Sequence, residues 1–240
     1  MLVLKSPAKV RFDQEPPPVR LALTSLAEHR FLEALAGRKI VLACGNPLLL
    51  SALAYDPGLK KHLVAAVTTE AEAVEAVSKL FADFVIATDH LEAGHGTHLL
   101  GHFDHLRTLL FLDSNSPAAI QEAVEAGVDG IVPLSSLQPD GSGGAIQAIA
   151  AVGKGGTWVP KAVSEVVSRS DAHALEMCEK MTRAEREILS ELGKGLTNDE
   201  IAQKLVVSEE TVKSHLKSVR QKLGFSDRVK LALVAIHAGL

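Results

Sequence analysis

The chain has 240 residues and a formal net charge of −4, with 47% hydrophobic and 22% charged residues, a balance typical of a folded soluble protein. No apolar run approaches the roughly 18 residues that a membrane-spanning helix needs, and the first ten residues lack the pattern of a secretory signal. The two cysteines, Cys44 and Cys178, are far apart and have no metal-ligand spacing. We therefore expect a cytoplasmic protein with reduced thiols and no membrane partner.

Residues 1–38 are expected to form an N-terminal arm and an extra helix. The consecutive prolines Pro16 to Pro18 lack backbone donors and favour an extended arm. The apolar spacing of Val19 to Ala36 then indicates a helix, which Gly37 ends.

Short apolar runs alternate with helical patterns throughout residues 39–160. This alternation is typical of βαβ units and predicts an α/β, flavodoxin-like, doubly wound domain with five parallel strands. A ligand site in such a domain lies at the carboxyl ends of the strands. The expected strands are Ile40–Ala43, Leu63–Val67, Phe84–Ala87, Leu109–Leu112 and Gly130–Val132, and the expected helices include Thr69–Leu80, Pro117–Ala126 and Ala145–Val152.

Residues 161–180 are expected to form a helical linker, and residues 181–240 a separate all-α domain. Four helix starts in this domain can be recognised from capping chemistry. Thr182 with Glu185 and Thr197 with Glu200 fit the capping box, in which each side chain satisfies a free backbone donor. Ser208 and the pair Ser226-Asp227 are the expected starts of the last two helices.

The helices expected at 198–205 and 209–223 are joined by a turn of only three residues, which is typical of a helix-turn-helix. The second of them has an apolar stripe, formed by Val212, Leu216, Val219 and Leu223. A basic stripe runs beside it, formed by Lys213, Lys217 and Arg220. A helix with these two stripes can pack on its partner and lie in a major groove, whereas an isolated basic stripe is more often a solvated face.

Residues 181–189, 195–202, 205–216 and 222–224 closely resemble the output domain of the LuxR/NarL family of transcription regulators. The resemblance implies a four-helix domain that binds double-stranded DNA as a homodimer. By family position, the residues that face bases would be Lys213, Ser214 and Lys217. Those near phosphates would be Asn198, Lys204, Ser208, Thr211 and Arg220, and those of the dimer contact would be Val229, Leu233 and His237.

The domain at residues 39–160 resembles, in layout, the receiver domain of response regulators. A working receiver needs clustered acids for Mg²⁺, an aspartate that accepts phosphoryl and a lysine. Here each role is altered: the acid pair is replaced by Cys44 and Gly45, the acceptor aligns with Thr88 next to Asp89, the hydroxyl position is Asp113 and the lysine position is Leu134. The resemblance therefore implies a pseudo-receiver with a degenerate phosphorylation site.

Five of the ten histidines lie within sixteen residues, at His90, His95, His98, His102 and His105. Such a cluster could sense a metal or pH, or could be an exposed polar segment. Cys44 could likewise be a redox sensor or a small buried side chain. No set of nucleophile, base and orienting group is visible, so we expect neither an enzyme, nor a cofactor, nor a resident metal.

The sequence thus predicts a DNA-binding transcription regulator whose receiver-like domain serves dimerisation or senses a protein partner or small ligand. The alternative is a conventional two-component response regulator that is phosphorylated on Asp89. A third hypothesis is an interaction scaffold whose basic helix does not bind DNA.

Overall fold

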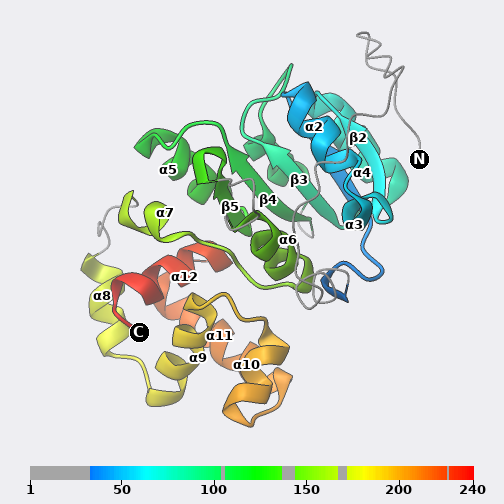
Figure 1. Ribbon diagram of the computed structural model, residues 1–240. Helices are drawn as coiled ribbons and strands as arrows, with labels where there is room; N and C mark the ends of the chain where they lie inside the picture. The colour runs from blue at the N-terminus through cyan, green and yellow to red at the C-terminus, as the bar shows by residue number, and fades with distance from the viewer. Residues whose placement is uncertain (1–32, 104–105, 137–143, 167–171, 226) are drawn as a thin grey trace.

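The computed structural model describes residues 33–103, 106–136, 144–166, 172–225 and 227–240. The described residues form a parallel sheet covered by helices, followed by a group of helices near the carboxyl terminus (Figure 1). The expected N-terminal arm, most of the helix expected at Val19 to Ala36, and Ser226 lie outside the described residues.

The sheet consists of five parallel strands in the order β2-β1-β3-β4-β5. All five predicted strands are confirmed, and three of them are one or two residues longer than expected. Their sequences are almost entirely apolar because helices cover both faces of the sheet. The strands are β1 (Ile40–Ala43), β2 (Leu63–Val67), β3 (Phe84–Thr88), β4 (Arg107–Leu112) and β5 (Gly130–Pro133).

Helices cover the sheet in two layers. One apolar cluster joins the sheet to side chains such as Leu53, Leu59 and Ile149 from α2 (Pro47–Ala54), α3 (Pro57–Lys60) and α6 (Ala145–Lys154). The other joins it to side chains such as Ala76, Leu99 and Ile120, from α4 (Glu70–Leu80), the 3-10 helix η1 (Gly96–His102) and α5 (Pro117–Ala126). A short 3-10 turn, η2 (Leu134–Ser136), follows β5. The doubly wound α/β fold is therefore confirmed.

The remaining helices form the second part of the chain. They are α7 (Lys161–Val166), α8 (Ala172–Glu179), α9 (Arg183–Gly193), α10 (Asn198–Leu205), α11 (Glu209–Leu223) and α12 (Arg228–His237). Both predicted capping boxes are present, at Thr182 with Glu185 and at Thr197 with Glu200. The N-cap of α12 is Asp227, whose side chain makes no capping hydrogen bond.

Helix α12 lies against the sheet domain (Figure 1). Val229 and Leu233 belong to the same buried cluster as Ile131 of β5 and Val163 of α7. At the end of α12, His237 Nε2 lies 2.8 Å from the carbonyl oxygen of Ser164. The burial of Val229 and Leu233 beside Ile131 joins the sheet domain and the helical part into one packed body. In the part of the chain that the structure describes, no helix combines the length and the apolar character required to cross a bilayer.

Candidate functional site

Helix α11 presents two chemically different sides, as its sequence predicts. The apolar stripe of Val212, Leu216, Val219 and Leu223 is buried, at 5% exposure or less for each residue. It packs on α9 and α10 in a cluster that also contains Ile188 and Ile201. The helix starts at Ser208, whose hydroxyl accepts a hydrogen bond from the Thr211 N–H at 3.1 Å, and ends at Gly224 in a left-handed conformation.

The side of α11 next to this stripe is polar and open to solvent. Lys213, Ser214, Lys217 and Arg220 are all exposed, at spacings that place them along one side of the helix. The Lys213 ammonium pairs with Glu209 one turn earlier at 3.1 Å, and both side chains remain about half exposed. Such a pair holds the lysine weakly, so Lys213 can exchange it for a phosphate or a base edge.

The other predicted DNA-binding residues surround the start of α11. Lys204 and Ser208 are exposed, and Asn198 and Thr211 are partly buried. The Lys204 ammonium lies 2.6 Å from the Glu191 carboxylate. The structure therefore places the eight predicted residues on α10, on the turn after it and on α11. The assignment of individual residues to bases or phosphates stays a prediction.

Glu185 fixes α11 relative to α9. Its buried carboxylate caps α9 through Thr182 and also accepts hydrogen bonds from the Ser218 hydroxyl at 2.7 Å and from the Lys222 ammonium. Burial acts to raise the pKa of Glu185, but the bonds from Lys222, Ser218 and Thr182 prevail and lower it to about 2. Sequence reasoning assigned Glu185 only to the cap, because its partners are more than thirty residues away.

Three arginines meet between the two parts of the chain. A polar cavity of about 430 Å³ is lined by Arg107 and Asp129 of the sheet domain and by Asn198, Arg220 and Arg228 of the helical part. The Arg228 guanidinium donates to Asn198 Oδ1 at 2.9 Å. Burial, followed by the charges of Arg220 and Arg107, lowers the pKa of Arg228 to about 10. Two predicted phosphate contacts, Asn198 and Arg220, thus lie where the domains meet.

The predicted dimer residues are covered by the chain itself. Val229 is fully buried and Leu233 is 4% exposed, both against the sheet domain, and His237 contacts Ser164. Dimerisation through these residues stays a prediction. It requires that α12 separate from the sheet domain.

The second candidate site lies at the carboxyl ends of β1, β3 and β4, where the sequence places the degenerate phosphorylation site. Thr88 is 1% exposed, its hydroxyl donates to the His90 carbonyl at 2.7 Å, and it accepts from the Gly45 N–H at 3.1 Å. The hydroxyl thus joins the turn after β1 to the loop after β3. This arrangement gives Thr88 a structural role that needs no phosphoryl group.

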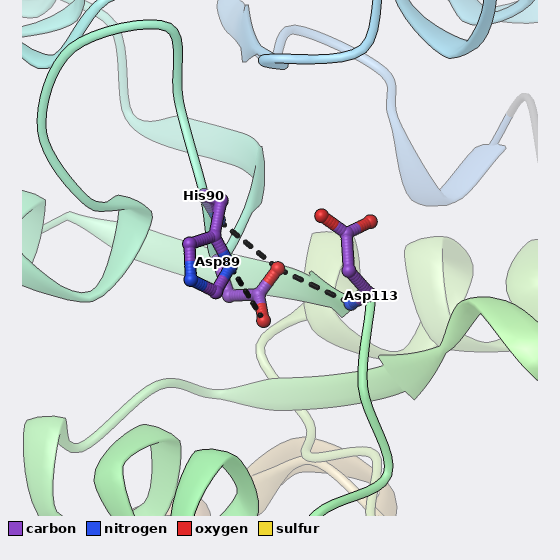
Figure 2. Close-up of side chains that lie close together, drawn as sticks. All are labelled: Asp89, His90 and Asp113. Carbon is purple, nitrogen blue, oxygen red and sulfur yellow. Dashed lines mark hydrogen bonds and ion pairs between the residues drawn. The ribbon is translucent and has the colours of Figure 1, made fainter.

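Asp89 points toward β4 and is 6% exposed (Figure 2). Its Oδ1 accepts from the backbone N–H groups of His90 at 3.0 Å and of Asp113 at 3.1 Å. Its Oδ2 is buried, accepts no hydrogen bond, and lies 3.3 Å from His90 Nδ1. Burial and then the negative charge of Asp89 raise the pKa of Asp113 above its ordinary value.

Cys44 and Leu134 complete the predicted set. Cys44 is fully buried in the apolar cluster below the site, and this burial, with a smaller effect of Asp113, raises the pKa of its thiol to about 12. A thiol with so high a pKa is a poor nucleophile and a poor redox sensor. Leu134 packs against the same cluster, so it supplies packing at the position where a receiver has its lysine.

The described histidines of the cluster lie near two different carboxylates, those of Asp89 and Glu70. His90 faces Asp89, whereas His98 and His102 lie 3.4 and 3.7 Å from the carboxylate of Glu70, at the start of α4. His95 lies between the groups, with ring centroids 5.3 Å from His90 and 5.2 Å from His98. His105 is outside the described residues. Among those described, only Asp89, His90 and Asp113 bring three potential metal ligands within 4.8 Å of one another.

The model for bacterial regulatory proteins of the luxR family matches residues 179–235. The transcriptional regulatory protein LnrK of Bacillus subtilis is 26% identical over 84% of this chain and 98% of its own length. The DNA-binding transcriptional activator DevR/DosR of Mycobacterium tuberculosis is 28% identical over 78% of this chain and 87% of its own. Among solved structures, the response regulator RcsB of Salmonella typhimurium has a TM-score of 0.47 and 23% identity, over 81% of this chain and 96% of that one.

Proposed function

We propose that the chain is a transcription regulator that binds double-stranded DNA through α10 and α11. The premise is the match of residues 179–235 to the luxR family of bacterial regulatory proteins. The observation that carries this proposal is the exposed row of Lys213, Lys217 and Arg220, which runs beside the buried apolar stripe of the same helix. A helix held in this way can lie in the major groove, where basic side chains reach base edges and phosphates.

The geometry around α11 suits this task. Ser208 and Thr211 lie at its amino-terminal end, and their side chains carry hydroxyl groups, which are common donors to phosphate oxygens. Lys204 is exposed on the preceding helix, where its ammonium pairs with the Glu191 carboxylate. The bonds between Glu185, Ser218 and Lys222 fix the angle of α11, so the basic row is presented by a rigid element.

The experiment measures binding to fragments selected from genomic DNA, by fluorescence anisotropy at several salt concentrations. We expect Lys213→Ala and Lys217→Ala each to weaken binding about 10-fold or more. Each lost phosphate contact should also reduce the slope of log affinity against log salt concentration. Lys79→Ala is a matched control, because Lys79 is also an exposed helical lysine that pairs with a glutamate four residues earlier, but on α4. If the wild type shows no salt-sensitive binding to any fragment, the interaction-scaffold hypothesis replaces this proposal.

The receiver-like domain, in our proposal, controls the regulator without conventional aspartyl phosphorylation, through a protein partner, a small ligand or dimerisation. In support, the two residues after β1, Cys44 and Gly45, have no carboxylate. Leu134 is at the position where, by the resemblance to receivers, a lysine would neutralise the phosphoryl charge. The alternative is phosphorylation of Asp89, whose carboxylate lies at the end of β3. Incubation with acetyl phosphate and Mg²⁺, followed by intact-mass measurement, decides between them. A stable adduct on Asp89 would establish the alternative.

A further inference from the structure

The carboxyl ends of β3 and β4 bring together three side chains with metal-binding chemistry. One ligand atom from each of Asp89, His90 and Asp113 lies within 4.8 Å of the other two (Figure 2). A single bound ion holds carboxylate oxygens and imidazole nitrogens at about 2.0–2.2 Å, so its ligands are only a few ångström apart. His90 and Asp113 are exposed and can close the remaining distance by side-chain rotation.

The buried member of the group has an unused ligand atom. The two N–H groups that bind Asp89 Oδ1 fix the orientation of its carboxylate. Oδ2 is then directed at His90 and accepts no hydrogen bond, although Asp89 is only 6% exposed. A buried oxygen that accepts no hydrogen bond is unfavourable, and His90 Nδ1, 3.3 Å away, forms an ion pair with it only when the imidazole is protonated. A cation bound between the two side chains is therefore favoured.

We propose that Asp89, His90 and Asp113 bind one divalent transition-metal ion of the Zn²⁺ type, in a site separate from the DNA-binding surface. Two carboxylates bring a charge of −2 and the imidazole brings a nitrogen ligand, a combination that suits Zn²⁺ and similar ions better than Mg²⁺. Three protein ligands leave at least one position open, to be filled by water or by a group of a partner molecule.

This ligand set differs from the acid cluster that a working receiver uses for Mg²⁺. Here both carboxylates come from the ends of β3 and β4, and the turn after β1 contributes only Cys44, with its fully buried thiol, and Gly45. Bound metal would hold the His90 ring in one position. Because the His90 ring contacts that of His95 in a tilted arrangement, and the His95 ring contacts that of His98 in the same way, the loop that joins β3 to η1 would then lose mobility.

The test uses the full, tag-free chain and ZnCl₂ in competition with a chromophoric chelator. We expect one Zn²⁺ per chain, and at least 10-fold weaker binding in His90→Ala and in Asp113→Asn. These two residues are exposed, so neither substitution disturbs the core. His98→Ala is the matched control, because its side chain is 58% exposed and that of His90 is 64% exposed.

Three results would overturn the proposal. The first is the absence of stoichiometric Zn²⁺ binding in the wild type. The second is a loss of affinity in His98→Ala as large as that in His90→Ala, which would assign the ion to the histidine cluster around Glu70. The third is tighter binding of Mg²⁺ than of Zn²⁺, which would indicate a receiver-type magnesium site. DNA binding is not a readout here, so the outcome is independent of the proposed function.

Discussion

The Glu185 carboxylate lies 2.7 Å from the Lys222 ammonium, thirty-seven residues further along the chain. Glu185 is 3% exposed at the start of α9, and Lys222 is in the last turn of α11. A charge buried in this way is stable only while its partners remain in place, because removal of one of them leaves the other without compensation. The pair therefore makes the position of α11 depend on α9.

The first prediction is that Glu185→Gln lowers the free energy of unfolding by roughly 2–3 kcal/mol. Because the folded-state pKa of about 2 is below the ordinary 4.5, the stabilisation is fully present above pH 4.5 and is lost as the pH falls toward 2. Urea unfolding between pH 7 and pH 3 measures it. The difference between wild type and variant should shrink at low pH, whereas the exposed control Glu187→Gln should differ little from wild type throughout. A difference that stays constant with pH would contradict the prediction.

The turn between α10 and α11 contains a strained residue. Val206 has a φ of 57° and is 90% exposed, so a β-branched side chain adopts a left-handed conformation without compensating burial. We expect Val206→Gly to raise the free energy of unfolding by about 1 kcal/mol, as measured by thermal denaturation. Val207→Gly is the control, because Val207 is not among the residues with positive φ, and there glycine should destabilise. If both variants are destabilised equally, the strain at Val206 is not relevant to stability.

The sequence predicted local structure well because the relevant signals are local. The strands β1 and β2 and the helices α5, α10 and α11 have the predicted bounds, and Thr182 and Thr197 form the predicted caps. Helix α2 was missed, although Asn46 caps it and Pro47 occupies its first turn, which is a recognisable start signal.

Contacts between distant segments could not be predicted in the same way. The proximity of Asp89 to Asp113 depends on the register of β3 and β4, in which Thr88 pairs with Phe111. The burial of Leu233 against the sheet domain has no signature in the helical pattern, because the same apolar side would serve a dimer. The sequence already offered His90 as part of a possible metal-sensing histidine cluster, but it did not indicate that Asp89 and Asp113 would be the groups beside it.

The two parts of the chain approach closely at two glycines. The Thr157 N–H donates to the Gly195 carbonyl at 3.3 Å, and a Cβ atom at Gly156 would lie only 2.2 Å from that carbonyl oxygen. We therefore predict that Gly156→Ala weakens the contact between the domains, and that the backbone amides of α12 exchange with deuterium faster. Lys154→Ala is the control, because Lys154 is exposed at the end of α6, only two residues before Gly156. Equal exchange of α12 in wild type and Gly156→Ala would refute this prediction.

Release of α12 is also a condition for the predicted dimer, because Val229 and Leu233 cannot contact the sheet domain and a second chain at once. We expect the wild type to be mainly monomeric at micromolar concentration without DNA, and Gly156→Ala to dimerise more strongly. Sedimentation velocity over a range of concentrations measures both. Adding Leu233→Asp to Gly156→Ala should abolish the dimer, since a carboxylate buried in an apolar interface carries a large desolvation cost. If the double variant still dimerises, another surface forms the dimer. If the wild type dimerises as strongly as Gly156→Ala, release of α12 is not what limits association.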